Sequence, residues 1–530
     1  MKPPTLHLIC NAHLDPVWRW RWEEGCAEAL STFHVAVELL EEHTQLIFNH
    51  NEAVLYQWVQ EYAPDLFRRI QALVQAGRWC ISGGWFLQPD VNLPDTESLI
   101  RQITTGRAFF REHFGVEPRV AYNFDSFGHS AGLPQLLVRS GYAMYIHMRP
   151  QAQDLTLPSD LYRWRGLDGS EILTLRIVVG LYHTERDNLV SRLEEGVALA
   201  LKLNRDVPVF WGIGDHGGGA TREDLQRLDA FMQRETRVAI VHSSTERLYA
   251  ALQEAGKQAP IVEGELQRVF TGCYTSLARL KRQSVKSLGS VIQAEALRTA
   301  TWWRHDQEYP ASALNEVWRD HLFNDFHDIL PGSCVEPAEQ DALALYGKVS
   351  SAARRLRLGT AAAFNAGQPL PLYLPVTVLN TNPSCPCVPV EVEAMLDCAP
   401  SEPGNGTCNS APSPGRLWLA RRNNRRRCYL SMVGGAKWSS WPTCRNSACS
   451  TTTWKSTRAN ASRNPRCPVC CMVQTPRPAW SPRSTQAAGV SVSADLCPRR
   501  WWSPTLAIRG AANGGVTANG WVSSSVNLAV

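Results

Sequence analysis

His13 and Asp15 place an imidazole and a carboxylate two residues apart in the segment Asn11-Ala-His-Leu-Asp-Pro-Val-Trp18. Side chains at this spacing project from the same side of an extended chain. Zinc accepts nitrogen and oxygen ligands of these kinds. Trp18 and the Trp20–Trp22 neighbourhood follow, and aromatic faces beside polar groups suit a sugar ring. The alternatives are a hydrogen-bonded pair in a surface loop and a tryptophan that only packs.

A second cluster is Asn123-Phe-Asp-Ser-Phe-Gly-His-Ser130, in which Asp125 lies where an extended segment turns and Gly128 permits the turn. An aspartate before a helix is also a common N-cap, and a helix is predicted over Ala131–Arg139. We interpret His129 as a hydrogen-bonded structural histidine.

Two further clusters carry acids. His327 and Asp328 are neighbours close to a predicted helix end, where pairing with the helix terminus is the alternative. The loop Gly212-Ile-Gly-Asp-His-Gly-Gly-Gly219 presents Asp215, and its glycine spacing matches neither phosphate-binding motif.

The elements that must position these residues alternate along residues 1–260, where short apolar runs are separated by amphipathic segments. This alternation predicts an α/β fold with a parallel sheet, wound open or closed into a barrel. The predicted strands are Leu6–Cys10, Arg119–Tyr122, Ala143–His147, Glu171–Ile177 and Val207–Ile213, and the predicted helices include Ala53–Gln60, Leu66–Ala76, Glu97–His113, Leu193–Leu203 and Arg222–Arg234.

Three of the predicted strands end in polar clusters, which contain His13 and Asp15, Asp125, and Asp215. Active sites of α/β barrels lie past the carboxyl ends of their parallel strands. We therefore expect a (β/α) barrel-like catalytic domain over residues 1–265.

The next part of the chain is helical in pattern, over Tyr274–Thr301 and Ser312–Phe323, and Ile329-Leu-Pro-Gly332 ends the second helix. It predicts a small helical bundle domain over residues 266–360. Residues 361–396 are expected to begin a β-sandwich domain, because Val388–Leu396 alternates like a strand.

Residues 397–530 differ in charge from the rest of the chain. They contain 17 Lys and Arg against three acids, a net charge of +14, which leaves −9 for residues 1–396. They also hold nine of the 16 cysteines and none of the 14 histidines. We expect an aberrant tail, disordered or frameshifted. A frameshifted reading of a GC-rich gene explains the composition, and resequencing the DNA around codon 396 tests it.

Two motifs in the tail carry little weight. Cys467-Pro-Val-Cys470 has metal-ligand spacing but lacks a second pair, so it does not predict a zinc ribbon. The basic residues are not organised on one face, so no nucleic acid partner is expected.

Taken together, the clusters resemble the motifs of glycoside hydrolase family 38, the α-mannosidases, in order. Asn11–Trp18 is similar to the opening metal motif and Phe124–Ser130 to the nucleophile motif. Three more blocks are similar: Gly83-Gly-Trp-Phe-Leu-Gln-Pro-Asp-Val-Asn-Leu-Pro94 with Arg101-Gln102, Gly272-Cys-Tyr-Thr-Ser276, and Phe326-His-Asp-Ile-Leu-Pro-Gly332. The resemblance spans residues 5–395. The loop around Asp215 resembles the cytosolic and bacterial branch.

The resemblance implies a retaining α-mannosidase that hydrolyses terminal α-linked mannose through a covalent mannosyl-aspartate intermediate. Asp125 would be the nucleophile and Asp215 the acid/base. A Zn²⁺ ion would bind the sugar hydroxyls, and its ligands would be His13, Asp15, Asp125 and His327. The substrate-binding residues would be Trp18, Phe127, Asp328 and Tyr274.

Two other functions stay open. A metal-dependent carbohydrate hydrolase or deacetylase on a related barrel would activate water at the same ligands. An inactive sugar-binding remnant is the second alternative, because the tail stands where the family has β domains.

Location and partners follow from simpler features. No apolar run approaches the roughly 18–20 residues of a membrane helix, so no membrane partner is expected. Met1-Lys-Pro-Pro-Thr5 does not begin a secretory leader, which predicts a cytoplasmic protein and cysteines without a disulfide framework. The expected partner is a mannose-containing oligosaccharide or glycoside, and a homo-oligomer is left open.

Overall fold

A computed structural model describes residues 3–366 and the short segments 374–377, 379–381, 390–394, 418–420, 428–432, 505–508 and 526–527. The chain divides into two compact units. The first unit is Met1–Glu295 with Tyr309–Leu356, and the second is Ala296–Glu308 with Arg357–Val530. Every predicted site residue belongs to the first unit.

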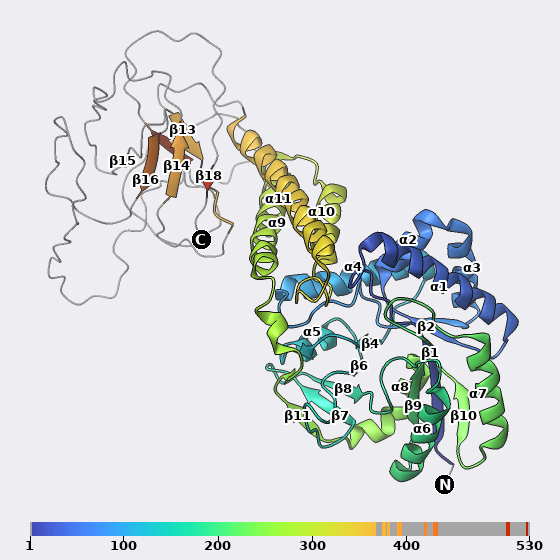
Figure 1. The fold of residues 1–530 in the computed structure, drawn as a ribbon. Helices are drawn as coiled ribbons and strands as arrows, with labels where there is room; N and C mark the ends of the chain where they lie inside the picture. The colour runs from blue at the N-terminus through green and yellow to red at the C-terminus, as the bar shows by residue number, and fades with distance from the viewer. Residues whose placement is uncertain are drawn as a thin grey trace, which may run out of the picture. The chain divides into compact units, whose positions relative to one another are not determined.

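The first sheet is parallel and centres on β1 (Figure 1). β1 is buried along its whole length, as expected of a strand covered on both faces. β1 pairs with β2, β9 and β10, and β2 pairs with β3. These strands are β1 (Thr5–Asn11), β2 (Phe48–His50), β3 (Trp79–Ile81), β9 (Val207–Trp211) and β10 (Ala239–His242).

The second sheet has the order β11-β7-β8-β6-β4. Its pairs are parallel except β7 with β8, which is an antiparallel hairpin. The strands are β4 (Val120–Asn123), β6 (Met144–His147), β7 (Leu161–Arg165), β8 (Glu171–Arg176) and β11 (Ile261–Glu263), and a separate antiparallel pair is formed by β5 (Gly128–His129) and β12 (Leu266–Gln267).

The α/β fold with parallel sheets is therefore confirmed. The described strands of residues 1–267 form two five-stranded sheets and one antiparallel pair, and the Gly83 N–H after β3 donates to the Val120 carbonyl of β4 at 2.8 Å. A single closed barrel stays a prediction.

Helices follow most of the strands (Figure 1). Their bounds are α1 (Trp22–Glu42), α2 (Ala53–Tyr62), α3 (Pro64–Gln75), α4 (Thr96–Phe114), α5 (Leu133–Arg139), α6 (Leu189–Leu203), α7 (Arg222–Arg234), α8 (Thr245–Lys257), α9 (Ala278–His305), α10 (Ala311–Phe323) and α11 (Glu336–Asn365). The five predicted strands and the five helices predicted between them are confirmed within a few residues.

Two details of the prediction were wrong. Tyr274 does not begin the first helix of the later region, because Thr271–Tyr274 forms a 3-10 turn and α9 starts at Ala278. The 21-residue helix α1 was missed, because its aromatic start was interpreted as part of a sugar site. Trp22 instead begins the helix and lies 6.3 Å from the Trp58 ring.

The tail prediction falls mostly outside the described residues. Within them, β14 (Val390–Ala394) agrees with the strand predicted over Val388–Leu396. Other short strands lie in segments where no strand was predicted: β13 (Leu374–Thr377), β15 (Trp418–Ala420), β16 (Cys428–Met432), β17 (Thr505–Ile508) and β18 (Val526–Asn527). In the part of the chain that is described, no helix is long and apolar enough to cross a membrane.

Helix α1 packs directly behind the segment that carries His13 and Asp15, and Gly25 permits this approach. A Cβ on Gly25 would lie 2.2 Å from the Pro16 carbonyl oxygen and 2.7 Å from its carbon. No real Cβ tolerates such contacts with backbone, so a side chain here must displace Pro16 or the helix.

We predict that Gly25→Ala lowers the midpoint of thermal unfolding, because overpacking destabilises the fold by about 1–3 kcal/mol. Gly289→Ala in α9 is the matched control, because its Cβ would meet nothing within 4 Å. The control should gain about 0.5–1 kcal/mol from helix propensity. Equal midpoints for the two variants would show that α1 does not press on this segment.

Candidate metal and active site

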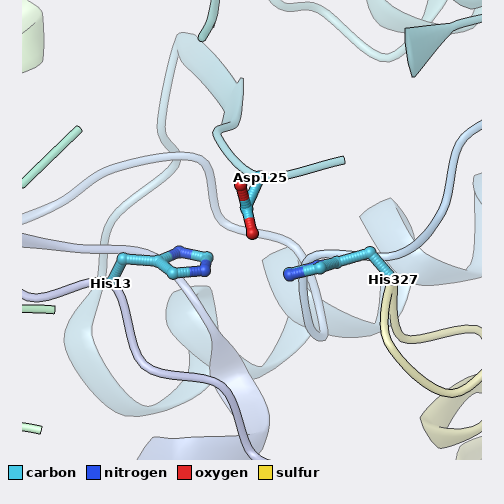
Figure 2. A group of neighbouring side chains, drawn as sticks. All are labelled: His13, Asp125 and His327. Atoms are coloured by element: carbon cyan, nitrogen blue, oxygen red, sulfur yellow. The ribbon is translucent and has the colours of Figure 1, made fainter. Parts of the chain in front are cut away.

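Three distant segments bring His13, Asp125 and His327 together. His13 follows β1, Asp125 follows β4, and His327 follows α10. One ligand atom from each lies within 4.8 Å of the other two. Figure 2 shows the two imidazoles facing each other, with the Asp125 carboxylate directed into the gap between them.

Asp15 lies between the same two histidines. Its Oδ1 atom is 2.9 Å from His13 Nε2 and 3.2 Å from His327 Nε2. Two further groups of atoms within 4.8 Å of one another extend the cluster: His13, Asp15 and Asp215, and Asp15, His327 and Asp328. The structure thus brings all four predicted ligands into one cluster with both flanking acids.

The buried atoms at the centre of this cluster fit a metal ion. His13 Nε2, Asp15 Oδ1 and His327 Nε2 are buried and face one another, but none of them makes a well-directed hydrogen bond to a described residue. Burying polar atoms without such hydrogen bonds is costly. Tetrahedral zinc, with bonds of about 2.0–2.2 Å, holds its ligand atoms about 3.3–3.6 Å apart, near the 2.9 Å and 3.2 Å that separate Asp15 Oδ1 from the two histidine nitrogens. The donor set of imidazole and carboxylate therefore suits zinc.

The electrostatics of the cluster also favour a bound cation. Burial alone would lower the pKa of both histidines, but Asp15 and its acidic neighbours outweigh it. The pKa of His13 is raised to about 9 and that of His327 to about 10. Burial opposes ionisation of Asp15, yet the two histidines hold its pKa well below the usual range. The carboxylate is ionised and attracts positive charge.

Asp125 is not an N-cap, so that alternative is wrong. Helix α5 starts at Leu133 with Gly132 before it, and β5 intervenes. The Asp125 side chain is 15% exposed, and its Oδ1 atom accepts a hydrogen bond from Arg149 Nε at 2.7 Å. It is therefore both anchored and accessible.

The backbone of Asp215 is hydrogen-bonded to the segment that contains His13 and Asp15. Its N–H donates to the His13 carbonyl at 2.7 Å, and its carbonyl accepts from the Asp15 N–H at 2.9 Å. Its φ of 66° lies in the left-handed region, which costs energy for a residue with a Cβ. Tyr182 Oη donates to its Oδ1 atom at 2.7 Å.

The predicted substrate-binding residues lie at different places. Phe127 is nearest, with its ring 6.2 Å from that of His327. Trp18 is half-buried, and Arg19 lies 4.8 Å over its ring. Asp328 is 3% exposed and accepts a hydrogen bond from the Ser333 hydroxyl. Tyr274 lies in the 3-10 turn Thr271–Tyr274, and its hydroxyl accepts a hydrogen bond from the Asn92 side chain at 2.9 Å.

His129 is structural, as predicted. It is fully buried, its Nδ1 atom lies 2.8 Å from the Tyr145 hydroxyl, and its Nε2 atom donates to the Arg149 carbonyl at 2.8 Å. His147 Nδ1 contacts the same carbonyl at 2.8 Å. These two histidines hold the backbone of Arg149 beside Asp125.

Arg149 and Tyr182 were not predicted from the sequence, although one signal pointed to Arg149. Arg149 follows the predicted strand Ala143–His147, and the rule applied to three other strand ends would have selected it. Tyr182 lies six residues past β8, too far for that rule. Its ring contacts that of His13 at 4.5 Å.

Comparison with known proteins places this site in a family. Residues 3–265 match the Glycosyl hydrolases family 38 N-terminal domain, and residues 268–363 match the Alpha mannosidase middle domain. Alpha-mannosidase 2C1 of Mus musculus is 31% identical over 388 residues, which cover 72% of this chain and 37% of that protein. The Alpha-mannosidase of Saccharomyces cerevisiae is 28% identical, covering 62% and 32%.

A solved structure has the same fold. The alpha-mannosidase from Enterococcus faecalis V583 superposes with a TM-score of 0.65 at 17% identity, over 81% of this chain and 53% of that one. The match with the curated relatives spans about a third of their length. The chain is related to the glycoside hydrolases. Within them, it belongs to family 38.

Glu52 is a buried acid beside the cluster. It is fully buried, its Oε1 atom accepts from the Gln88 N–H at 2.9 Å, and its Oε2 atom lacks a partner among the described residues. Burial raises its pKa to about 7, against a lowering influence from His13 and His327. Because the folded-state pKa exceeds the unfolded value of 4.5, stability falls as the pH rises from about 4.5 to 7.

We predict that Glu52→Gln removes this loss in metal-free protein. The free energy of unfolding of the variant relative to the native chain should rise by about 3 kcal/mol between pH 4.5 and 8. Chemical unfolding in the presence of a chelator measures it, with the exposed Glu112→Gln as control. A difference that does not change with pH would contradict the assignment.

Proposed function

We propose that this chain carries the catalytic site of a retaining α-mannosidase that removes terminal α-linked mannose from an oligosaccharide or glycoside. The observation that supports it most is the placing of two carboxylates around one cluster. A carboxylate oxygen of Asp125 and one of Asp215 each lie within 4.8 Å of a ring nitrogen of His13. Each is held by a separate partner, Arg149 for Asp125 and Tyr182 for Asp215.

In this proposal, an Asp125 oxygen attacks the anomeric carbon while the bond to the leaving oxygen breaks. Asp215 gives its proton to that oxygen, so a covalent mannosyl-aspartate forms and the aglycone departs. Asp215 then takes a proton from water, which attacks the same carbon and releases mannose and the Asp125 carboxylate. The charge of Arg149 beside Asp125 stabilises the carboxylate before attack and after release.

Tyr182 and Arg149 each orient one of the two acids. The Tyr182 hydroxyl donates to Asp215, and the guanidinium of Arg149 donates to Asp125. The backbone bridge between Asp215 and the His13–Asp15 segment keeps the acid at a set distance from the cluster. Holding reacting groups in place in this way lowers the entropic part of the barrier.

We propose Zn²⁺ as the cofactor, held by His13, Asp15, Asp125 and His327. When bound, it would supply a positive charge and coordinate sugar hydroxyls. Trp18 and Phe127 are proposed to contact the sugar ring. Asp328 is proposed to hydrogen-bond its hydroxyls, because it lies in one group of metal-ligand atoms with Asp15 and His327. Tyr274 is proposed as a further substrate-binding residue.

The finer predictions about architecture and setting belong to this proposal. They are a barrel-like catalytic domain over residues 1–265, a helical bundle over 266–360, the start of a β-sandwich over 361–396, and the aberrant tail over 397–530. A cytoplasmic location and the absence of membrane and nucleic acid partners also stay predictions.

We predict that the protein hydrolyses aryl α-mannosides, that exhaustive chelation abolishes the activity, and that zinc restores it. The reason is that both histidines and Asp15 lose their shared cation. Release of the aryl group measures the rate, and His327→Ala is the control that zinc should not rescue. Full activity after complete metal removal would contradict the zinc assignment.

A second prediction concerns Asp125. An activated 2-fluoro-mannoside should label it covalently, and Asp125→Ala should lower kcat by about 10³-fold or more. The matched control is Asp95→Ala, because Asp95 is a real N-cap that accepts from the Glu97 N–H at 2.9 Å. It should cost about 1 kcal/mol of stability and leave kcat unchanged. Turnover without labelling would favour a water-activating hydrolase or deacetylase.

A further inference from the structure

Gln88 contacts both proposed ligand histidines, through different groups. Its backbone carbonyl lies 2.8 Å from His327 Nδ1, and its side-chain nitrogen lies 3.1 Å from His13 Nδ1. Its side-chain oxygen accepts from the backbone N–H of Phe124 at 2.7 Å. Gln88 is 2% exposed, so water cannot replace these contacts. One residue therefore sets the hydrogen bonding of both rings.

The orientation of the Gln88 amide follows from its surroundings. A backbone N–H can only donate, so the group that faces Phe124 must be the amide oxygen. The amide NH₂ then faces His13 Nδ1, and this contact requires a lone pair on that nitrogen. Zinc binds the neutral form of histidine, and a neutral imidazole carries a single N–H. In the neutral ring, the Gln88 contact therefore favours the proton on Nε2, the atom 2.9 Å from Asp15.

His327 has the opposite arrangement. Its Nδ1 atom faces a carbonyl, which can only accept, so in the neutral ring Nδ1 carries the proton and Nε2 has the lone pair. This is the usual state of a metal-binding histidine, whose second nitrogen donates to a carbonyl or carboxylate. The contacts of Gln88 thus favour the metal-binding tautomer of His327 and disfavour the metal-binding tautomer of His13.

Binding a metal through His13 Nε2 moves the ring proton to Nδ1, where it meets the Gln88 NH₂. Turning the amide does not remove the conflict, because its NH₂ group then faces the Phe124 N–H. Every arrangement leaves one buried donor without an acceptor, which is costly. A group with two acceptors would satisfy both donors.

We propose that Gln88 is a positioning residue that lowers the metal affinity of this site by favouring the neutral tautomer of His13 in which Nε2 carries the proton. The inference rests on the metal site of the proposed function. An outer contact of this kind changes metal affinity by about 10–100-fold. Gln88→Glu should therefore tighten zinc binding by that factor, because a carboxylate accepts from both Phe124 and His13.

The experiment measures zinc affinity of the full chain by competition with a chromophoric chelator. The variants are Gln88→Glu and Gln88→Met, whose side chain has neither donor nor charge. Asn92→Asp is the control for added charge, because the Asn92 side chain contacts Gln267 and Tyr274. Zinc that His327→Ala still binds lies elsewhere and is subtracted. Circular dichroism checks that each variant is folded.

The expected result is tighter binding by Gln88→Glu, no loss with Gln88→Met, and little change with Asn92→Asp. A 10–100-fold loss with Gln88→Met would overturn the proposal, because the amide would then support the site. Equal gains for Gln88→Glu and Asn92→Asp would overturn it in favour of charge alone. If Gln88→Glu does not fold, the sign of the Gln88→Met effect decides.

Failure of the proposed function has a different signature. If the native chain and all variants bind no zinc beyond what His327→Ala retains, the metal site itself is wrong. If zinc binds at the site with the same affinity in the native chain and in Gln88→Glu, only the role of Gln88 is wrong.

Discussion

The buried Asp15 carboxylate between two imidazoles is the constraint on which the site depends. One of its oxygens lies 2.9 Å and 3.2 Å from nitrogens of His13 and His327, with almost no exposure to water. A charge buried in this way must be balanced by a cation or by protons. Because the two histidines come from segments more than 300 residues apart, that balance also ties β1 to the loop after α10.

The two acids proposed for catalysis depend on the same frame. Asp215 is paired through its backbone with the chain on both sides of Leu14, and a left-handed φ directs its side chain. Asp125 follows β4 and is held by Arg149, whose carbonyl is fixed by His129 and His147. The structural histidines His129 and His147 therefore act on the proposed chemistry through Arg149.

Prediction from sequence succeeded where one physical signal dominated. Buried parallel strands such as β1 and β9 are continuous apolar runs, and helices such as α7 have a clear 3.6-residue period, so both were found. Helix α1 was missed because its tryptophan-rich start was interpreted as an aromatic surface for a sugar ring. The start of α9 was placed too early, because the 3-10 turn at Thr271–Tyr274 continues the apolar pattern without helical hydrogen bonds.

By itself, the sequence determined which side chains the site contains, since the order of its motifs resembles one family and polar residues follow the carboxyl ends of its strands. Only the tertiary structure decided how they are used. The orientation of the His13 ring depends on Gln88, and the anchoring of Asp125 and Asp215 depends on Arg149 and Tyr182. These contacts join residues 24 to 75 positions apart. No local spacing records them, because hydrogen-bond direction is set only when the segments meet.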